Sequence, residues 1–204
     1  MKYPKLREIV EAAKALVMGP CTTAFPKKPS PAPEGYRGRP TYNEDECVGC
    51  GACFNSCPAR AITMEDCLES SPPKRTLIVR YDHCIFCQTC EINCITDKGI
   101  VLETEYNMVS DNRSDQQMSV EKELVVCDVC GSVITAREHL SWLYNKLGPI
   151  ASANPTLMLS SFKTLKIAEE PENKPEQREP GDVSRGDRMR ILCPVCRAKV
   201  SVLI

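Results

Sequence analysis

The residues of this chain whose types and spacing could do chemistry are its cysteines, 14 in 204 residues. Eight of them fall into two runs of the same spacing, Cys-x2-Cys-x2-Cys-x3-Cys. A cubane [4Fe–4S] cluster needs four thiolates around a compact core, and this run wraps three cysteines around one cube and sends the fourth to a second cube. Two complete runs therefore predict two [4Fe–4S] clusters. The runs are Cys47, Cys50, Cys53 and Cys57, then Cys84, Cys87, Cys90 and Cys94.

The exchange of the last cysteine of each run fixes the expected ligands. Each iron then has a thiolate and no open coordination position, which favours electron transfer over transformation of a substrate. Zinc knuckles are the alternative, but zinc sites do not need four cysteines in this order. Gly49 and Gly51 would give the backbone room to approach the sulfides. Cluster one is expected to be held by Cys47, Cys50, Cys53 and Cys94, and cluster two by Cys84, Cys87, Cys90 and Cys57.

A second constellation lies towards the C-terminus, where two Cys-x2-Cys pairs, Cys127 with Cys130 and Cys193 with Cys196, stand far apart in the sequence. The pairs predict a tetrahedral site of four thiolates, with zinc as the first expectation and a single iron as the rival, because this geometry serves both metals. Zinc would close the tail without carrying electrons. The four ligands are Cys127, Cys130, Cys193 and Cys196.

The remaining candidates have weaker patterns. Cys21 and Cys67 are predicted to be unliganded thiols, because twelve cysteines fill three four-cysteine sites. His83 adjoins Cys84 and could influence cluster two through a proton-linked charge, or it could be a surface histidine beside the cluster. His139 is predicted to be structural.

Composition and charge exclude several classes of protein. The formal net charge of −1 suggests no nucleic-acid partner. The segment 1–19 lacks the uninterrupted apolar core of an export signal, and no stretch approaches the roughly 18 apolar residues of a membrane span. Closely spaced cysteines suit metal ligation in a reducing compartment better than disulfides. We therefore expect a cytoplasmic protein.

The elements that must position these cysteines predict an α+β fold, a bacterial-type two-cluster ferredoxin with additions at both ends. Apolar residues recur at helical spacing over 1–19, which predicts an amphipathic helix ended by Gly19 and Pro20. That helix packs either on the protein's own core or on a membrane-bound partner. Residues 20–43 contain six prolines and predict an extended arm.

The ferredoxin domain is expected over residues 44–105, with short strands at 61–64 and 99–102 and an alternating strand at 76–81. A linker is expected at 106–120, followed by a zinc-ribbon-like tail at 121–204. Within this tail, Thr135 and Glu138 read as a capping box that starts a helix running to about Leu147. The charged, proline-rich segment 168–188 predicts a mobile loop.

Taken together, these features resemble a known family, the eight-iron ferredoxin subunit of formate hydrogenlyase and related energy-converting, membrane-bound [NiFe] hydrogenases. The corresponding subunit of respiratory complex I is similar more distantly. The resemblance is carried by Gly-Pro-Cys-Thr-Thr-Ala-Phe-Pro at 19–26, by Tyr-Arg-Gly-Arg-Pro at 36–40 and by both cysteine runs. The tail pairs, Cys127 with Cys130 and Cys193 with Cys196, resemble the formate hydrogenlyase subunit.

The resemblance implies a role and partners. Such a subunit relays electrons between an electron-input module and the small hydrogenase subunit, which passes them to the Ni–Fe site of the large subunit. Its N-terminal helix and arm lie on the membrane-arm subunits, so that the protein is associated peripherally with the cytoplasmic face of the membrane. The donor could be formate dehydrogenase, carbon monoxide dehydrogenase or a soluble ferredoxin. Two alternatives remain, a relay subunit of a complex I–like quinone oxidoreductase and a stand-alone ferredoxin whose zinc tail binds nucleic acid.

Overall fold

The computed structural model describes residues 5–19, 22, 25, 27–165 and 175–202, and it divides the chain into two compact units, residues 1–36 and 37–204. The first unit contains helix α1 (Leu6–Met18), which begins where the backbone N–H of Lys5 donates to Glu8 Oε2 at 3.0 Å. The helix ends at Gly19, whose φ of +72° a residue with a side chain adopts only with strain. The predicted N-terminal helix is therefore present. None of its residues is buried within this unit, and among the described residues no helix is long and apolar enough to cross a membrane.

The second unit begins with the elements that carry the two cysteine runs. Strand β1 (Pro40–Tyr42), at the end of the segment 20–43 that the sequence predicted as an extended arm, pairs antiparallel with β4 (Ile100–Leu102) of the predicted ferredoxin domain. The short helices α2 (Ala52–Ser56) and α3 (Thr89–Ile92) occupy equivalent places in the two runs, since each contains the third cysteine of its run. Each helix starts after a residue with positive φ, because the chain must turn sharply between the second and third cysteine of a run.

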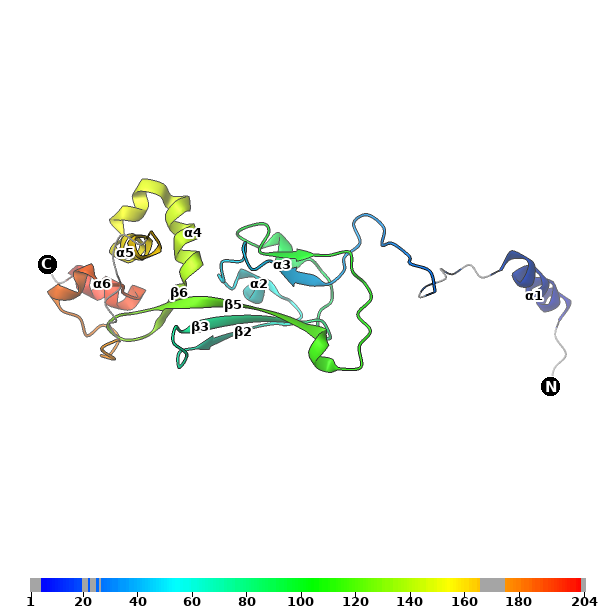
Figure 1. Ribbon diagram of the computed structural model, residues 1–204, viewed down its shortest axis with the longest axis horizontal. Helices are drawn as coiled ribbons and strands as arrows, with labels where there is room; N and C mark the ends of the chain where they lie inside the picture. Colours follow the sequence, from blue (N-terminus) through cyan, green and yellow to red (C-terminus); the bar gives the residue numbers. More distant parts are fainter. Residues whose placement is uncertain (1–4, 20–21, 23–24, 26, 166–174, 203–204) are drawn as a thin grey trace. The chain divides into compact units, whose positions relative to one another are not determined.

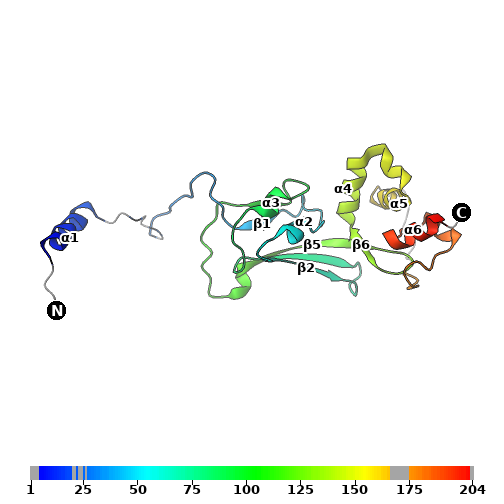
Figure 2. The same ribbon diagram turned by 180° about the vertical axis from the view of Figure 1, so that it is seen from behind.

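A four-stranded antiparallel sheet supports these helices, in the order β2 (Ile62–Cys67), β3 (Lys74–Arg80), β5 (Gln117–Val126) and β6 (Val133–Ala136). Figure 1 shows β2, β3 and β5 side by side, with α2 and α3 over one face, and Figure 2 shows the same arrangement from behind. The strand predicted at 76–81 is present in β3. Strand β5 begins at Gln117, inside the segment 106–120 that the sequence predicted as a linker.

The register of the sheet places three cross-strand rows on its inner face. Alternate residues of a strand point to the same face, so each row continues across β2, β3 and β5. Leu77, Val79 and Val120 are at most 1% exposed and form the centre of the core. The rows are Ile62–Val79–Met118, Met64–Leu77–Val120 and Asp66–Arg75–Lys122.

Helices and 3₁₀ turns make up most of the tail. The turn η1 (Arg113–Gln116) leads into β5; beyond β6 come α4 (Arg137–Leu147), η2 (Gly148–Ala153), α5 (Pro155–Thr164), η3 (Arg185–Met189) and α6 (Pro194–Val202). The predicted helix ending near Leu147 is present, but its predicted start is wrong. Thr135 belongs to β6 and its hydroxyl contacts His139 Nδ1 at 2.8 Å, so it does not cap the helix, which begins at Arg137.

The charged loop predicted at 168–188 is described only from Pro175 onward. Its described part is hydrogen-bonded to the first cysteine pair of the tail, with the N–H of Glu176 donating to Asp128 O at 3.1 Å and that of Arg178 to Val129 O at 2.9 Å. The Arg178 guanidinium also pairs with the buried Asp187 at 3.0 Å. The mobility of the remainder, like the predicted domain boundaries, stays a prediction.

Candidate iron–sulfur and metal sites

Two cavities in the second unit collect all eight cysteines of the runs. The first is lined by Cys57, Cys84, Cys87 and Cys90. The second is lined by Cys47, Cys50, Cys53 and Cys94. Each cavity therefore holds three cysteines of one run and the last cysteine of the other, the same sets that the sequence predicts for cluster two and cluster one. The ligation itself stays a prediction.

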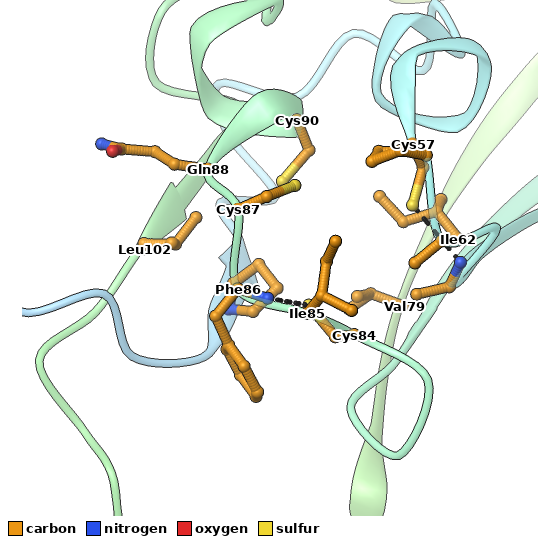
Figure 3. A pocket seen from close by; sticks show the side chains of 14 residues that line it. Cys57, Ile62, Val79, Cys84, Ile85, Phe86, Cys87, Gln88, Cys90 and Leu102 are labelled. Atoms are coloured by element: carbon orange, nitrogen blue, oxygen red, sulfur yellow. Dashed lines mark hydrogen bonds between the residues drawn. The ribbon is translucent and has the colours of Figure 1, made fainter.

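The cluster-two cavity is seen from close by in Figure 3, where Cys57 faces Cys87 and Cys90 across the open space. Apart from Gln88, its remaining lining residues are apolar and include Ile62 and Val79 from the sheet. Two backbone amides donate to its sulfurs, Phe86 N–H to Cys84 Sγ at 3.4 Å and Ala61 N–H to Cys57 Sγ at 3.3 Å. Such N–H···S bonds stabilise the negative charge of a ligating thiolate.

The cysteines of the cluster-one cavity are more buried than those of the cluster-two cavity. Cys47 and Cys53 are buried, whereas all four cysteines of the other cavity are only half-buried. The N–H of Ala52 donates to Cys50 Sγ at 3.5 Å, and the hydroxyl of the buried Tyr42 contacts Cys53 Sγ at 3.8 Å. The donor set of this cavity therefore fits a buried anionic group.

The two runs share their backbone conformation even where their residues differ. Gly49 and Gly51 have φ of +64° and +77°, as expected for positions where the chain turns close to a cluster. The corresponding positions of the second run are Phe86 and Gln88, with φ of +53° and +69°. A residue with a side chain is strained there. The second run thus keeps the turn at some cost in conformational energy, which indicates that the ligand geometry requires it.

Several thiols of the two cavities hold their protons more tightly than a free cysteine does, although hydrogen bonds from Thr89 lower the pKa of Cys87 and, despite burial, those from Thr96 lower that of Cys94. Burial raises the pKa of Cys53 to about 11 and that of Cys90 to about 12. Since thiolates and not thiols bind iron, loading these cavities would release protons and compensate the burial of the sulfurs.

The four tail cysteines form one compact group. The Sγ atoms of Cys127, Cys130, Cys193 and Cys196 all lie within 4.8 Å of one another. Cys130 Sγ is 3.7 Å from Cys193 Sγ and 3.8 Å from Cys196 Sγ. A tetrahedral ion with metal–sulfur bonds of about 2.3 Å separates its sulfurs by about 3.8 Å. The group therefore has the geometry of a four-thiolate metal site.

The surroundings of the tail site affect its thiols in opposite directions. Burial opposes ionisation of Cys193, but hydrogen bonds from the Cys196 amide and the Ser132 hydroxyl prevail and lower its pKa to about 6. Burial raises the pKa of Cys196 to about 12, although the N–H of Gly181 donates to its sulfur at 3.4 Å. Gly181 lies in the described part of the charged loop, so that loop closes over the site.

The other candidate residues, two cysteines and two histidines, do not belong to these three groups of cysteines. Cys67 is exposed at the end of β2, and Cys21 lies outside the described residues. His83 is exposed in the turn before Cys84. His139 is half-buried in α4, and burial, followed by the nearby charge of Arg75, lowers its pKa.

Sequence reasoning missed the charged row at the edge of cluster one. Arg75 donates from Nη1 to the carbonyl oxygen of Gly49 at 3.1 Å, and Lys122 donates to the carbonyl oxygen of Glu44 at 2.6 Å. A signal was present, because Arg75 shares the alternation of Leu77 and Val79, and Lys122 shares that of Val120. A cation at an inward position of an apolar strand indicates a buried anion or a paired charge.

Comparison with known proteins agrees with these two cavities. Residues 33–98 match the family model of the 4Fe-4S dicluster domain. This part of the chain is therefore an iron–sulfur domain of the ferredoxin type, within a mixed helix and strand fold that also carries a cysteine group near the C-terminus.

The relatives that the chain resembles are subunits of oxidoreductase complexes. Formate hydrogenlyase subunit 6 of Escherichia coli is 38% identical over 52 residues, 26% of this chain and 29% of the relative. F(420)H(2) dehydrogenase subunit I of Methanosarcina mazei is 39% identical over 57 residues, 28% of this chain and 32% of the relative. NADH-quinone oxidoreductase subunit I 2 of Geobacter metallireducens is 28% identical over 122 residues, 56% of this chain and 92% of the relative. The resemblance drawn from the sequence is confirmed by these relatives, although the chain spans only about a third of the first two.

A solved structure is similar at a lower level. It is the membrane-bound sulfane sulfur reductase, an archaeal respiratory membrane complex, with a chain 29% identical at a TM-score of 0.36, covering 57% of this chain and 61% of that one.

Proposed function

We propose that this chain is an electron-relay subunit that carries two [4Fe–4S] clusters within a membrane-associated [NiFe] hydrogenase complex. The observation that carries the proposal is the sorting of the eight cysteines into two neighbouring cavities, each completed by a cysteine of the other run. When bound, each cluster would take up and release one electron at a time.

The chain's own residues determine how the clusters would be held. Cys47, Cys50, Cys53 and Cys94 would hold cluster one, and Cys84, Cys87, Cys90 and Cys57 would hold cluster two. The cavities adjoin, since Cys53 of one lies close enough to Cys90 of the other that its charge, after the larger effect of burial, helps to raise the pKa of Cys90. The half-buried cysteines of cluster two place that site nearer the surface than cluster one, as an electron entry or exit point requires.

The tail site would hold a structural metal. Its sulfur separations suit zinc, and a single iron has the same geometry. Cys127, Cys130, Cys193 and Cys196 would thereby join β5, α6 and the charged loop, and the tail would be fixed to the sheet that supports the clusters.

Helix α1 would dock the chain on partner subunits. Its apolar residues Leu6, Leu16 and Val17 are 83%, 86% and 88% exposed within their own unit. The similarity to formate hydrogenlyase subunit 6 supports hydrogenase small and large subunits, membrane-arm subunits and an electron-input module as the partners. The chain would then lie peripherally on the cytoplasmic face of the membrane.

A complex I–like relay is the second candidate, because the relative from Geobacter metallireducens matches over 92% of its own length. That match covers only 56% of this chain. The tail pairs, Cys127 with Cys130 and Cys193 with Cys196, favour the hydrogenase complex, because they resemble the formate hydrogenlyase subunit.

The test is purification of the full chain from its native host under anaerobic conditions, with iron analysis, EPR spectroscopy and identification of the proteins that accompany it. We expect about eight irons in two cubanes and a Ni–Fe large subunit in the same complex. Zinc alone in the cysteine runs would contradict the two clusters. A quinone-site subunit in place of the Ni–Fe subunit would support the second candidate.

A further inference from the structure

The charged row Asp66–Arg75–Lys122 contains an arrangement that the sheet alone does not explain. Arg75 and Lys122 are direct cross-strand partners on β3 and β5, so their side chains leave the same face of the sheet. Their side chains are only 8% and 10% exposed. Like charges directly opposite on a sheet destabilise it, and burial increases the penalty.

The nearby carboxylates compensate this pair only partly. Asp66 accepts two hydrogen bonds from Arg75, at 2.7 and 2.9 Å, and so satisfies one of the two cations. Glu138 approaches Lys122 only at 3.9 Å and is 44% exposed. The ammonium of Lys122 is instead directed to the carbonyl oxygen of Glu44, at the start of the loop that carries Cys47.

Both cations converge on the cluster-one loop. Arg75 Nη1 donates to the carbonyl oxygen of Gly49, and the Cβ and Cγ atoms of Lys122 would lie 3.0 Å from a Cβ placed on Gly49. Both cationic side chains are thus held against the loop that carries Cys47 and Cys50. The two cations therefore favour negative charge at this site.

A thiolate-bound [4Fe–4S] cluster supplies that charge, about −2 when oxidised and one unit more after it accepts an electron. Burial disfavours the added electron because it removes the water that would stabilise the charge. Cluster one has the more buried ligands and would therefore be the harder to reduce. We infer that Arg75 and Lys122 offset this burial and raise the reduction potential of cluster one, which keeps it within reach of electrons from cluster two.

This inference rests on the proposed function, since it needs both clusters. The reaction it concerns is the transfer of one electron from the reduced form of one cluster to the oxidised form of the other, with no bond made or broken. Arg75 and Lys122 touch neither cluster in this account and act on cluster one through their charge.

The experiment is an EPR-monitored redox titration of the full chain, purified anaerobically with both clusters. Cys50→Ser and Cys87→Ser, each expected to alter one EPR signal, assign the two signals to cluster one and cluster two. Arg75→Gln is then expected to lower the reduction potential of cluster one by about 59 mV or more, which is a tenfold change in the equilibrium constant for one electron. The potential of cluster two should stay unchanged. Lys122→Gln is expected to act in the same direction.

Three further variants separate charge from structural damage. Arg75→Lys keeps the charge and should restore most of the potential, although it loses the two-pronged bond to Asp66. Asp66→Asn removes a negative charge and should raise the potential, the opposite sign from Arg75→Gln. Lys74→Gln, next to Arg75 but on the exposed face and paired with Glu121, should change neither potential.

The inference would be overturned if the chain held two clusters and neither Arg75→Gln nor Lys122→Gln changed the potential of either cluster. The proposed function would then still stand. Equal shifts of both clusters would overturn the inference in the same way. If the wild-type chain holds no cubane clusters, the proposed function fails first, and iron analysis of the wild type distinguishes that case. If Arg75→Gln does not fold, Lys122→Gln and Asp66→Asn decide the question by their opposite signs.

Discussion

A Cβ atom placed on Gly49 would lie 2.9 Å from the Cβ of Ala136, the last residue of β6. Gly49 sits between the first two cysteines of cluster one, and Ala136 leads into the first helix of the tail. The tail module and the cluster-one loop are therefore packed against each other at a point where only a glycine fits. Folding of the tail and loading of cluster one are expected to depend on each other.

Gly49→Ala is expected to destabilise the chain by about 1–3 kcal/mol, because it adds a methyl group to a closed contact at a residue with φ of +64°. Cluster one should be lost more readily than cluster two. The measurements are thermal unfolding and the rate of iron release to a chelator. Gly35→Ala is the matched control, since Gly35 has φ of +77° but nothing within 4 Å of its Cβ position. Equal effects of the two substitutions would show that the packing against Ala136 has no role.

Cys94→Ser is expected to impair cluster one, although Cys94 belongs to the second run. The sulfur of Cys94 lines the same cavity as Cys47, Cys50 and Cys53. The EPR signal assigned to cluster one should change or disappear, while that of cluster two persists. Cys67→Ser serves as the control, because Cys67 is an exposed cysteine outside both cavities. If Cys94→Ser altered the cluster held by Cys84, Cys87 and Cys90, the ligand sets would have to be exchanged.

Cys193→Ser is expected to release the tail metal and leave both cubane signals intact. Structural zinc binds in zinc-finger peptides with about 10–16 kcal/mol, so its loss should loosen α6 and the described part of the charged loop. Metal analysis and limited proteolysis of the tail measure the two effects. Metal analysis of the wild-type chain also identifies the tail metal, since zinc would be found beside the roughly eight irons of two cubanes, whereas a single iron would add one to them. Loss of a cubane signal would show that the tail cysteines belong to a cluster.

The sequence predicted which cysteines lie together better than it predicted the elements that support them. The x2-x2-x3 spacing has a geometric meaning on its own, and it was sufficient to group Cys57 with the second run and Cys94 with the first, as the two cavities do. Ligation of the clusters by these sets stays a prediction. The partners of Arg75 could not be predicted in this way. The position of Arg75 opposite Lys122 depends on the register of β3 with β5, two strands that are distant in the sequence, and register is set by packing rather than by local sequence.

Two local patterns show where sequence reasoning stopped. Thr135 and Glu138 have the spacing of a capping box, but Thr135 pairs with Val125 in the sheet, and tertiary pairing prevailed over the local signal. Conversely, the alternation of Met118, Val120, Lys122 and Leu124 is visible in the sequence and identifies β5. The start of the strand was nevertheless assigned to a linker, because Lys122 interrupts the apolar positions. Lys122 faces inward because its ammonium donates to the carbonyl oxygen of Glu44 beside the cluster-one loop.

Helix α1 provides a test of docking in the full chain. Ile9 and Leu16 lie two turns apart on one face and are 55% and 86% exposed. Replacing both by Glu should release the chain from the membrane fraction while both cubane signals remain. Glu11→Gln, on the opposite face, is the control and should leave the chain bound. If the double variant stays with the membranes, α1 is not the docking element.

Tyr42→Phe is expected to lower the potential of cluster one, because it removes the hydroxyl that lies 3.8 Å from Cys53 Sγ. Burial, followed by the charge of Cys53, holds the pKa of Tyr42 well above its usual value, so the hydroxyl keeps its proton and acts as the donor. A hydrogen bond of about 1 kcal/mol corresponds to about a fivefold change in the reduction equilibrium. Since the pKa is raised, the effect should persist unchanged from neutral pH up to about pH 10, above which an ordinary tyrosine ionises.

The same titration separates this hydrogen bond from a loss of packing. Tyr42→Phe keeps the buried ring and should change the unfolding temperature little, whereas Tyr42→Leu should lower both the potential and the stability. Tyr36→Phe removes the hydroxyl of a tyrosine that is 42% exposed, and it should change neither the potential of cluster one nor the unfolding temperature. If Tyr42→Phe leaves the potential of cluster one at its wild-type value, the hydroxyl does not donate to Cys53 once iron is bound, and the charges of Arg75 and Lys122 remain as the local groups that favour reduction.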